Sequence, residues 1–99
     1  MPNQFGDKIR NLRESDGLLL REIAPLLSID TPQLSKIERG ERQAKKEHIQ
    51  IFAQIFNANT DELLKIWLAD QMYNVIADEP LAKEAIKELI NVINKLNKI

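Results

Sequence analysis

Apolar residues recur along this chain at spacings of three and four, which is the period of an amphipathic α-helix. The first such segment covers about residues 4–15, with Phe5, Ile9 and Leu12 at positions i, i+4 and i+7. Asn3 stands where an N-cap would satisfy the first free backbone N–H groups. No segment shows the sustained alternation of a half-buried strand. The pattern therefore predicts an all-α protein whose first helix begins near residue 4.

Further helical segments follow, each separated by a short connection. Gly17, Gly40 and Asn57 stand where a left-handed residue would end the first, third and fourth helices. Asn59 and Glu62 have the spacing of a capping box and open a long fifth helix, Leu63 to about Ala77. The second to fourth helices are marked by Ile23, Ala24 and Leu27, by Leu34 and Ile37, and by Ile49, Phe52, Ala53 and Phe56.

The last segment carries a regular apolar seam. Asp78-Glu79-Pro80 breaks the chain, and Pro80 fits the first turn of a sixth helix. Residues 82, 86, 89, 93 and 96 are apolar and repeat at 4-3-4-3 spacing, as in the a/d seam of a coiled coil. The seam either packs on the body of its own chain or pairs, with the fifth helix, with a second copy. In the second case the dimer-interface candidates are Trp67, Ile86, Leu89, Ile93 and Leu96.

Two prolines fall in the stretch "IAPLLSIDTPQLSKIERG", residues 23–40. With Asp30 as N-cap, Pro32 lies in the first turn of the third helix, where no intrahelical N–H is lost. Pro25 lies beyond the first turn of the second helix and removes the hydrogen bond to the Arg21 carbonyl. We expect that helix to bend at Pro25 rather than to break. If Ser28 takes a positive φ in the following turn, it does so at a cost.

Composition limits the remaining possibilities. With 99 residues the chain forms one domain, which we divide into residues 1–78, with a core at 4–64, and a dimerising helix at 79–99. The chain has no cysteine and one histidine, so we expect no metal site and no cofactor. It has no glycine-rich phosphate loop and no nucleophile–base pair, and we do not expect an enzyme. No apolar run is long enough for a signal peptide or a membrane span, which favours a cytoplasmic protein.

Charge is unevenly distributed along the chain. The formal net charge is −1, but residues 36–46 contain five Lys or Arg against two Glu. A basic patch on an acidic body is typical of a protein that contacts phosphate groups. A solvated surface run would have the same composition.

The block "LRESDGLLLREIAPLLSIDTPQLSKIERGERQA", residues 12–44, resembles the lambda-repressor-like (Xre-type) helix-turn-helix family. The resemblance covers about residues 4–64. It implies a compact five-helix body in which the third helix enters the DNA major groove. To this body the apolar pattern adds a C-terminal helix. The matching residues are Leu12-Arg13, Gly17-Leu18, Ile23-Ala24, Leu27, Ile29, Leu34-Ser35, Ile37-Glu38-Arg39-Gly40 and Arg42.

The polar face of the third helix supplies the site candidates. The candidates for contact with base edges are Thr31, Pro32, Gln33 and Lys36, of which Pro32 comes from family position alone. The candidates for phosphate contact are Arg21, Ser35, Arg39, Arg42 and Lys45. The resemblance also implies a structural ion pair between Arg13 and Glu38. Where the family usually has a polar Thr-Gln pair this chain has Leu19-Leu20, so its second helix lacks a side-chain cap.

These features together predict a sequence-specific regulator that binds double-stranded DNA. We expect a homodimer that represses transcription from a pseudo-palindromic operator, with no small-molecule effector and no membrane partner. Restriction-modification controller proteins are similar in size and layout. One alternative is an antitoxin-type DNA-binding protein whose C-terminal helices bind a partner protein. Another is a protein-interaction module that does not bind DNA.

Overall fold

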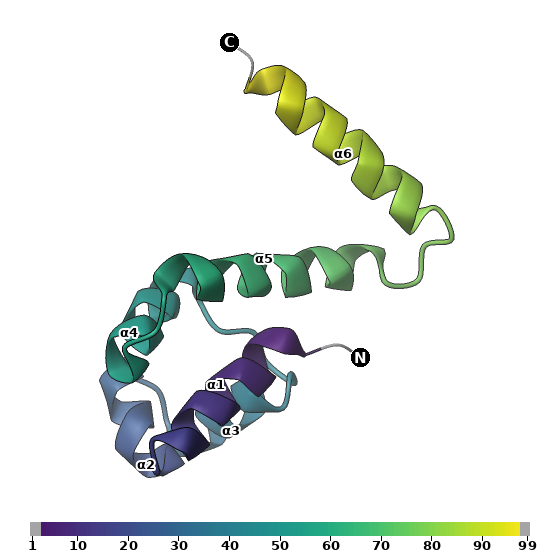
Figure 1. Cartoon of the computed structure of the whole chain (residues 1–99). Helices are drawn as coiled ribbons and strands as arrows, with labels where there is room; N and C mark the ends of the chain where they lie inside the picture. The colour runs from purple at the N-terminus through teal and green to yellow at the C-terminus, as the bar shows by residue number, and fades with distance from the viewer. Residues whose placement is uncertain (1–2, 98–99) are drawn as a thin grey trace.

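The computed structural model describes residues 3–97, and this part of the chain is all-helical, as predicted. The described residues leave out 1–2, at the start of the predicted segment 1–78, and 98–99, at the end of the predicted segment 79–99. Figure 1 shows a body built from the first five α-helices, from which the sixth projects. The elements are α1 (Gln4–Ser15), α2 (Leu20–Ile23), a 3-10 helix η1 (Ala24–Leu27), α3 (Thr31–Glu38), α4 (Lys46–Phe56), α5 (Thr60–Ile76) and α6 (Ala82–Leu96).

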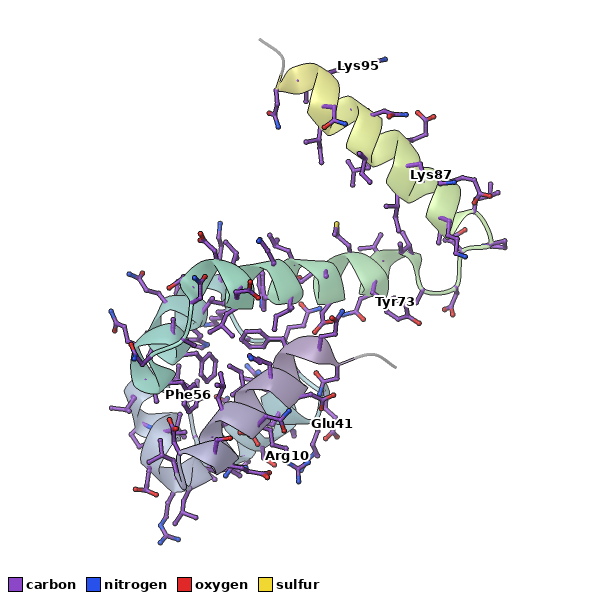
Figure 2. All side chains as sticks on the ribbon, viewed as in Figure 1. Arg10, Glu41, Phe56, Tyr73, Lys87 and Lys95 are labelled. Carbon is purple, nitrogen blue, oxygen red and sulfur yellow. The ribbon has the colours of Figure 1, made fainter. Side chains whose placement is uncertain are left out.

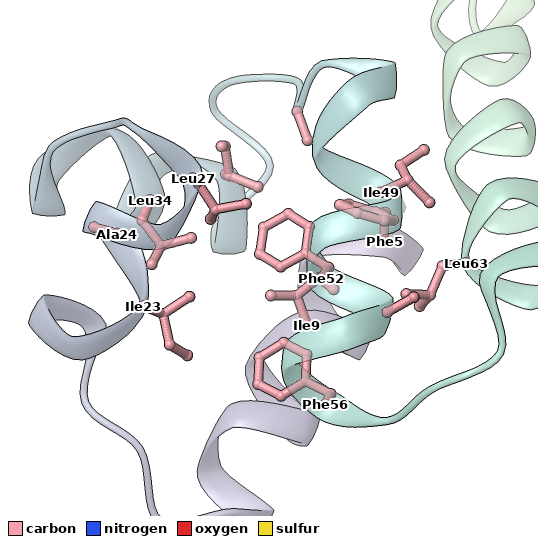
Figure 3. Close-up of a cluster of buried hydrophobic side chains, with 13 residues drawn as sticks. Phe5, Ile9, Ile23, Ala24, Leu27, Leu34, Ile49, Phe52, Phe56 and Leu63 are labelled. Atoms are coloured by element: carbon pink, nitrogen blue, oxygen red, sulfur yellow. The ribbon is translucent and has the colours of Figure 1, made fainter.

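The core of the body is a single cluster of apolar side chains contributed by α1 to α5. Phe52 of α4 lies fully buried at its centre (Figure 3). Its ring meets Phe5 edge to face, with centroids 5.7 Å apart, and stacks on Phe56 at 6.3 Å. Such aromatic pairs add to the burial of apolar area, and the Phe5–Phe52 pair joins α1 to α4. The buried apolar residues are Phe5, Ile9, Ile23, Ala24, Leu27, Leu34, Ile37, Ala44, Ile49, Phe52, Ala53, Phe56 and Leu63.

The second predicted helix changes its hydrogen-bond pattern at Pro25. The α-helical part ends at Ile23, and residues 24–27 continue as a 3-10 helix. Because the proline has no N–H to give, tighter 3-10 bonding takes over where the bend was expected. Ser28 ends the turn with φ 58°, the left-handed conformation anticipated above.

The start of α2 is capped in a way that the sequence did not suggest. Leu19 has no polar side chain, but its backbone N–H donates to Glu22 Oε1 at 2.8 Å. This is the Glu half of a capping box, without the usual hydroxyl half. The Leu19 side chain gives no cap, as expected, and Glu22 satisfies only the N–H of Leu19 itself.

Asn3 does not cap α1, contrary to expectation. Its Nδ2 donates to the backbone carbonyl of Glu38 at the end of α3, at 2.7 Å. The free N–H of Phe5 is satisfied instead by Asp70 of α5, whose Oδ2 accepts it at 2.8 Å. The cap of the first helix thus comes from a residue 65 positions later in the chain.

The helices α5 and α6 extend away from this body. Leu63, in the first turn of α5, is fully buried, whereas the second half of α5 is largely exposed. α6 begins at Ala82, after a turn that includes Pro80, so the proline does not lie in its first turn as predicted. After Ala82 every described residue of α6 is exposed, and the helix runs back over α5 without resting on the body (Figure 1). The seam therefore does not pack on the body of its own chain here.

Among residues 3–97, no helix combines the length and the hydrophobicity needed to cross a lipid bilayer.

Candidate nucleic-acid interface

α3 is held with one face in the core and the other toward solvent. Asp30 Oδ1 accepts the backbone N–H of Gln33 at 2.8 Å, which caps the helix N-terminus, and Pro32 in the first turn costs no hydrogen bond. Gly40, with φ +77°, allows the chain to leave the helix at its other end. Leu34 and Ile37 are buried. The helix therefore presents its polar residues outward.

An exposed stripe runs along the outer face of α3. Pro32, Lys36 and Arg39 are exposed and follow one another at i, i+4 and i+7, which places them on one side of the helix. Thr31, Gln33 and Ser35 flank this side and are half-buried. All four residues predicted to contact bases thus retain accessible surface on one short helix. A helix of this width with donors and acceptors on its outer face fits the major groove of B-DNA.

Cationic side chains continue from α3 into the loop before α4. Arg42 lies in that loop and Lys45 at the N-cap of α4, and both are exposed. Arg39 donates to Ser35 Oγ at 2.9 Å and pairs with Glu41, which lies in the same loop (Figure 2). An exposed pair of this kind is worth only about 0–1 kcal/mol, so a phosphate can replace the Glu41 carboxylate at little cost. Arg21 is exposed on α2, which packs against α3.

Arg13 and Glu38 form a two-pronged ion pair between α1 and the end of α3. Arg13 Nε donates to Glu38 Oε2 at 2.8 Å and Nη2 donates to Oε1 at 3.0 Å. Glu38 is buried, and Arg13 is nearly so. Hydrogen bonding to Glu38 raises the pKa of Arg13 above its ordinary value, although burial opposes the shift. Stability gained from a raised pKa is present at lower pH and is lost only as pH rises through that pKa, so the pair persists at neutral pH.

Two more contacts place α5 against the same region, and sequence reasoning missed both. Trp67 Nε1 donates to the carbonyl of Ala44, at the end of the loop that carries Arg42, at 2.8 Å. Asp70, one turn further along α5, accepts the N–H of Phe5. Trp67, a predicted dimer-interface residue, is thus partly packed on the body. In the sequence, the one hint of these two hydrogen bonds is that Trp67 and Asp70 bring polar atoms to a mainly apolar helix.

Within residues 3–97, no group of three or more His, Cys, Asp or Glu side chains is placed to hold a metal ion. The surface around α3 offers hydrogen-bond donors and positive charge.

Two short helical segments joined by a turn, the second with an exposed polar stripe, define a helix-turn-helix protein. The chain belongs to the helix-turn-helix domain family, whose sequence model matches residues 4–65. It is also similar to the HTH-type transcriptional regulator DdrOP3 of Deinococcus deserti, with 34% identity over 59 residues. The matched segment is 60% of this chain and 46% of that relative, so it spans less than half of the relative's length. No solved structure matches the chain significantly.

Proposed function

We propose that this chain is a sequence-specific, double-stranded-DNA-binding transcriptional regulator of the lambda-repressor-like (Xre) type. The observation that carries the proposal is the exposed stripe of Pro32, Lys36 and Arg39 on α3, beside the cationic loop at Arg42 and Lys45. Phosphate contacts set the affinity and position of such a protein, and base-edge contacts set its specificity. The likeness to a transcriptional regulator supports the same function.

The side chains of α3 divide into two roles. Lys36 and Gln33 donate hydrogen bonds to base edges, Thr31 contacts either a base edge or a methyl group, and Pro32 gives apolar contact to a thymine methyl. Arg39, Arg42, Lys45, Ser35 and Arg21 bind phosphate oxygens around this centre.

The regulator acts as a homodimer and represses by covering a promoter. Two copies read the halves of a pseudo-palindrome whose centres lie about 34 Å apart, one turn of B-DNA. The exposed seam of α6 supports dimerisation, since its four large apolar residues remain 41–64% exposed on their own chain.

Selection from a randomised duplex pool, followed by sequencing, tests the proposal directly. We expect one enriched pseudo-palindrome. The affinity for it should fall steeply as salt rises, and each neutralised phosphate should add about −0.9 to the slope of log affinity against log salt concentration. Arg42→Ala should lower that slope by about 1 and leave the selected sequence unchanged, while Lys36→Ala should relax one position of it. Lys65→Ala, an exposed lysine of α5, is the control and should change neither. Absence of duplex binding at low salt would refute the proposal.

A second candidate function is that of an antitoxin-type regulator, whose α5 and α6 bind a partner protein. The exposed apolar residues of α6 favour it as much as they favour a homodimer. Light scattering of the isolated chain separates the two, because a regulator that needs a different protein to cover α6 stays monomeric alone. A stable dimer at micromolar concentration would argue against the antitoxin.

A further inference from the structure

An apolar groove lies between the second half of α5 and the first half of α6. Its volume is about 200 Å³, and all six lining residues are apolar: Met72, Val75, Ile76, Ala85, Ile86 and Leu89. Figure 1 shows that the two helices diverge from the turn that joins them, so neither covers the other along its length. A further helix that lies in this groove would therefore pack against both α5 and α6, as in a helical bundle.

The apolar arc of α6 is wider than a two-stranded coiled coil needs. Ile86, Leu89, Ile93 and Leu96 occupy the a and d positions, and Ile90 and Val92 occupy the neighbouring e and g positions; all six are 41–64% exposed. In a two-stranded coil the e and g positions are usually charged, because only a and d are covered. Apolar e and g positions indicate a helix that is covered by two neighbours, as in a four-helix bundle.

The charges of the two helices lie away from the groove. α5 contains three carboxylates and one lysine, Asp61, Glu62, Asp70 and Lys65, and so carries −2. α6 contains three lysines and two glutamates, Lys83, Lys87, Lys95, Glu84 and Glu88, and so carries +1. Lys87 and Lys95 lie on the side of α6 that faces away from α5 (Figure 2). The half of α5 that lines the groove, residues 71–76, carries no charge, so a second α6 that lies there meets no like charge, whereas contact between two α6 helices alone brings two net positive charges together.

The apolar area also favours a partner that covers both helices. Ten large apolar side chains of α5 and α6 are 37–81% exposed. Together they offer on the order of 800 Å² in each copy, the amount that each partner contributes to a standard stable interface. The six side chains of α6 alone offer roughly half of this, which belongs to weak or transient contacts.

We propose that α6 of one copy lies in the α5–α6 groove of a second copy, and reciprocally. The two helices of each chain then form a four-helix bundle, with the isologous contacts of a two-fold dimer. This inference rests on the homodimer of the proposed function and specifies how its halves are joined. Because α5 runs unbroken from the bundle to Trp67 and Asp70, the bundle also determines how far apart the two α3 helices stand.

Cross-linking between chains tests this arrangement, since the protein has no cysteine of its own. Met72→Cys is made in a chain with a mass tag and Leu89→Cys in an untagged chain, and the mixture is oxidised after subunit exchange. With one cysteine in each chain, a mixed disulfide can form only between copies. We expect the yield of mixed dimer to be at least tenfold higher than in a control in which Glu88→Cys replaces Leu89→Cys. Glu88→Cys places the thiol on the polar side of α6. Both Met72 and Leu89 are half-exposed and outside the core, so circular dichroism spectra of the two variants should show the helix content of the wild type.

Each result has a distinct consequence. A Leu89→Cys homodimer disulfide without the mixed product would mean that α6 pairs only with α6, and would overturn this inference while leaving the homodimer intact. A dimer by light scattering that yields no excess mixed product would do the same. A monomer by light scattering would overturn both this inference and the proposed homodimer, while the duplex selection would still report on DNA binding by itself.

Discussion

Gly6 shows how one residue permits the contact between α1 and the end of α3. A Cβ at this position would lie 2.6 Å from the carbonyl oxygen of Glu38 and 2.5 Å from side-chain atoms of Asn3. Real Cβ atoms do not approach other atoms so closely, and a backbone carbonyl cannot rotate away as a side chain can. The end of α3, which presents Arg39, can therefore approach α1 only because residue 6 has no side chain.

Gly6→Ala should destabilise the protein, although alanine is the better helix former by about 1 kcal/mol. Overpacking of this kind typically costs about 1–3 kcal/mol, which outweighs the gain in propensity. Urea denaturation at 25 °C measures the difference. Gly6→Ala should lower the free energy of unfolding by a similar amount in an Asn3→Ala background, because the Glu38 carbonyl remains there. A stabilised Gly6→Ala variant would contradict the close approach.

Ser28 and Asn57 are the two described non-glycine residues with positive φ, at 58° and 51°. The left-handed conformation costs most side chains about 1–2 kcal/mol, and asparagine tolerates it better than serine. Ser28→Gly should therefore raise the free energy of unfolding by up to about 1 kcal/mol, and Asn57→Gly by less. Thermal melts of both variants check this order. An equal or larger gain at Asn57 would show that the strain at Ser28 is relieved by another route.

At the scale of elements, α1 depends on α5 for its N-terminal cap. Asp70 brings a negative charge and an acceptor to the positive end of the α1 dipole, and Trp67 ties the same helix to the loop before α4. The surface around α3 and the helix that leads to the groove are therefore parts of one rigid unit. This connection explains why residues beyond the core at 4–64 belong to the body.

Asp70→Ala should cost about 1 kcal/mol of stability, as does the loss of an N-cap. Asp70→Asn keeps an acceptor oxygen and loses only the charge, so a smaller loss is expected. Hydrogen exchange should locate the effect at the first turn of α1, where the Phe5 amide loses protection in Asp70→Ala. Unchanged protection of that amide would mean that another group caps the helix.

At the scale of the whole molecule, the body and the α6 arm are structurally separate. No described residue of α6 beyond Ala82 is buried, so changes there should leave the fold of the body intact. In the proposed homodimer, by contrast, operator affinity depends on both parts, because joining two DNA-binding helices raises affinity by about 10²–10⁴ through effective concentration.

Ile86→Glu with Ile93→Glu should convert the protein to monomers, since four charges cannot be buried in one dimer interface. Affinity for the full operator should fall at least 100-fold, with binding to a half-site unchanged. Light scattering and fluorescence anisotropy measure the two effects. Asn91→Glu with Asn94→Glu adds the same charge on the polar side of α6 and should remain dimeric. Dimers that survive both double substitutions would exclude the seam as the interface.

Most of the secondary structure could be predicted from local patterns in the sequence. The helix ends at Ser15, Glu38 and Phe56 follow from glycine and asparagine positions, and the cap at Asp30 follows from its spacing to Gln33. The outward stripe of α3 follows from helical periodicity, and the family resemblance singled out Arg13 and Glu38. Such features depend on residues within a few positions of one another, or on a pattern that the family shares.

Only the tertiary structure could decide the contacts between distant residues. The cap of α1 by Asp70, the Asn3 bond to Glu38 and the Trp67 bond to Ala44 each join residues 23 to 65 positions apart. The apolar seam of α6 was plain in the sequence, but periodicity says which face is apolar and not what covers it. The turn at residues 77–81 holds α6 clear of the body, because the chain after α5 leaves the core before α6 begins.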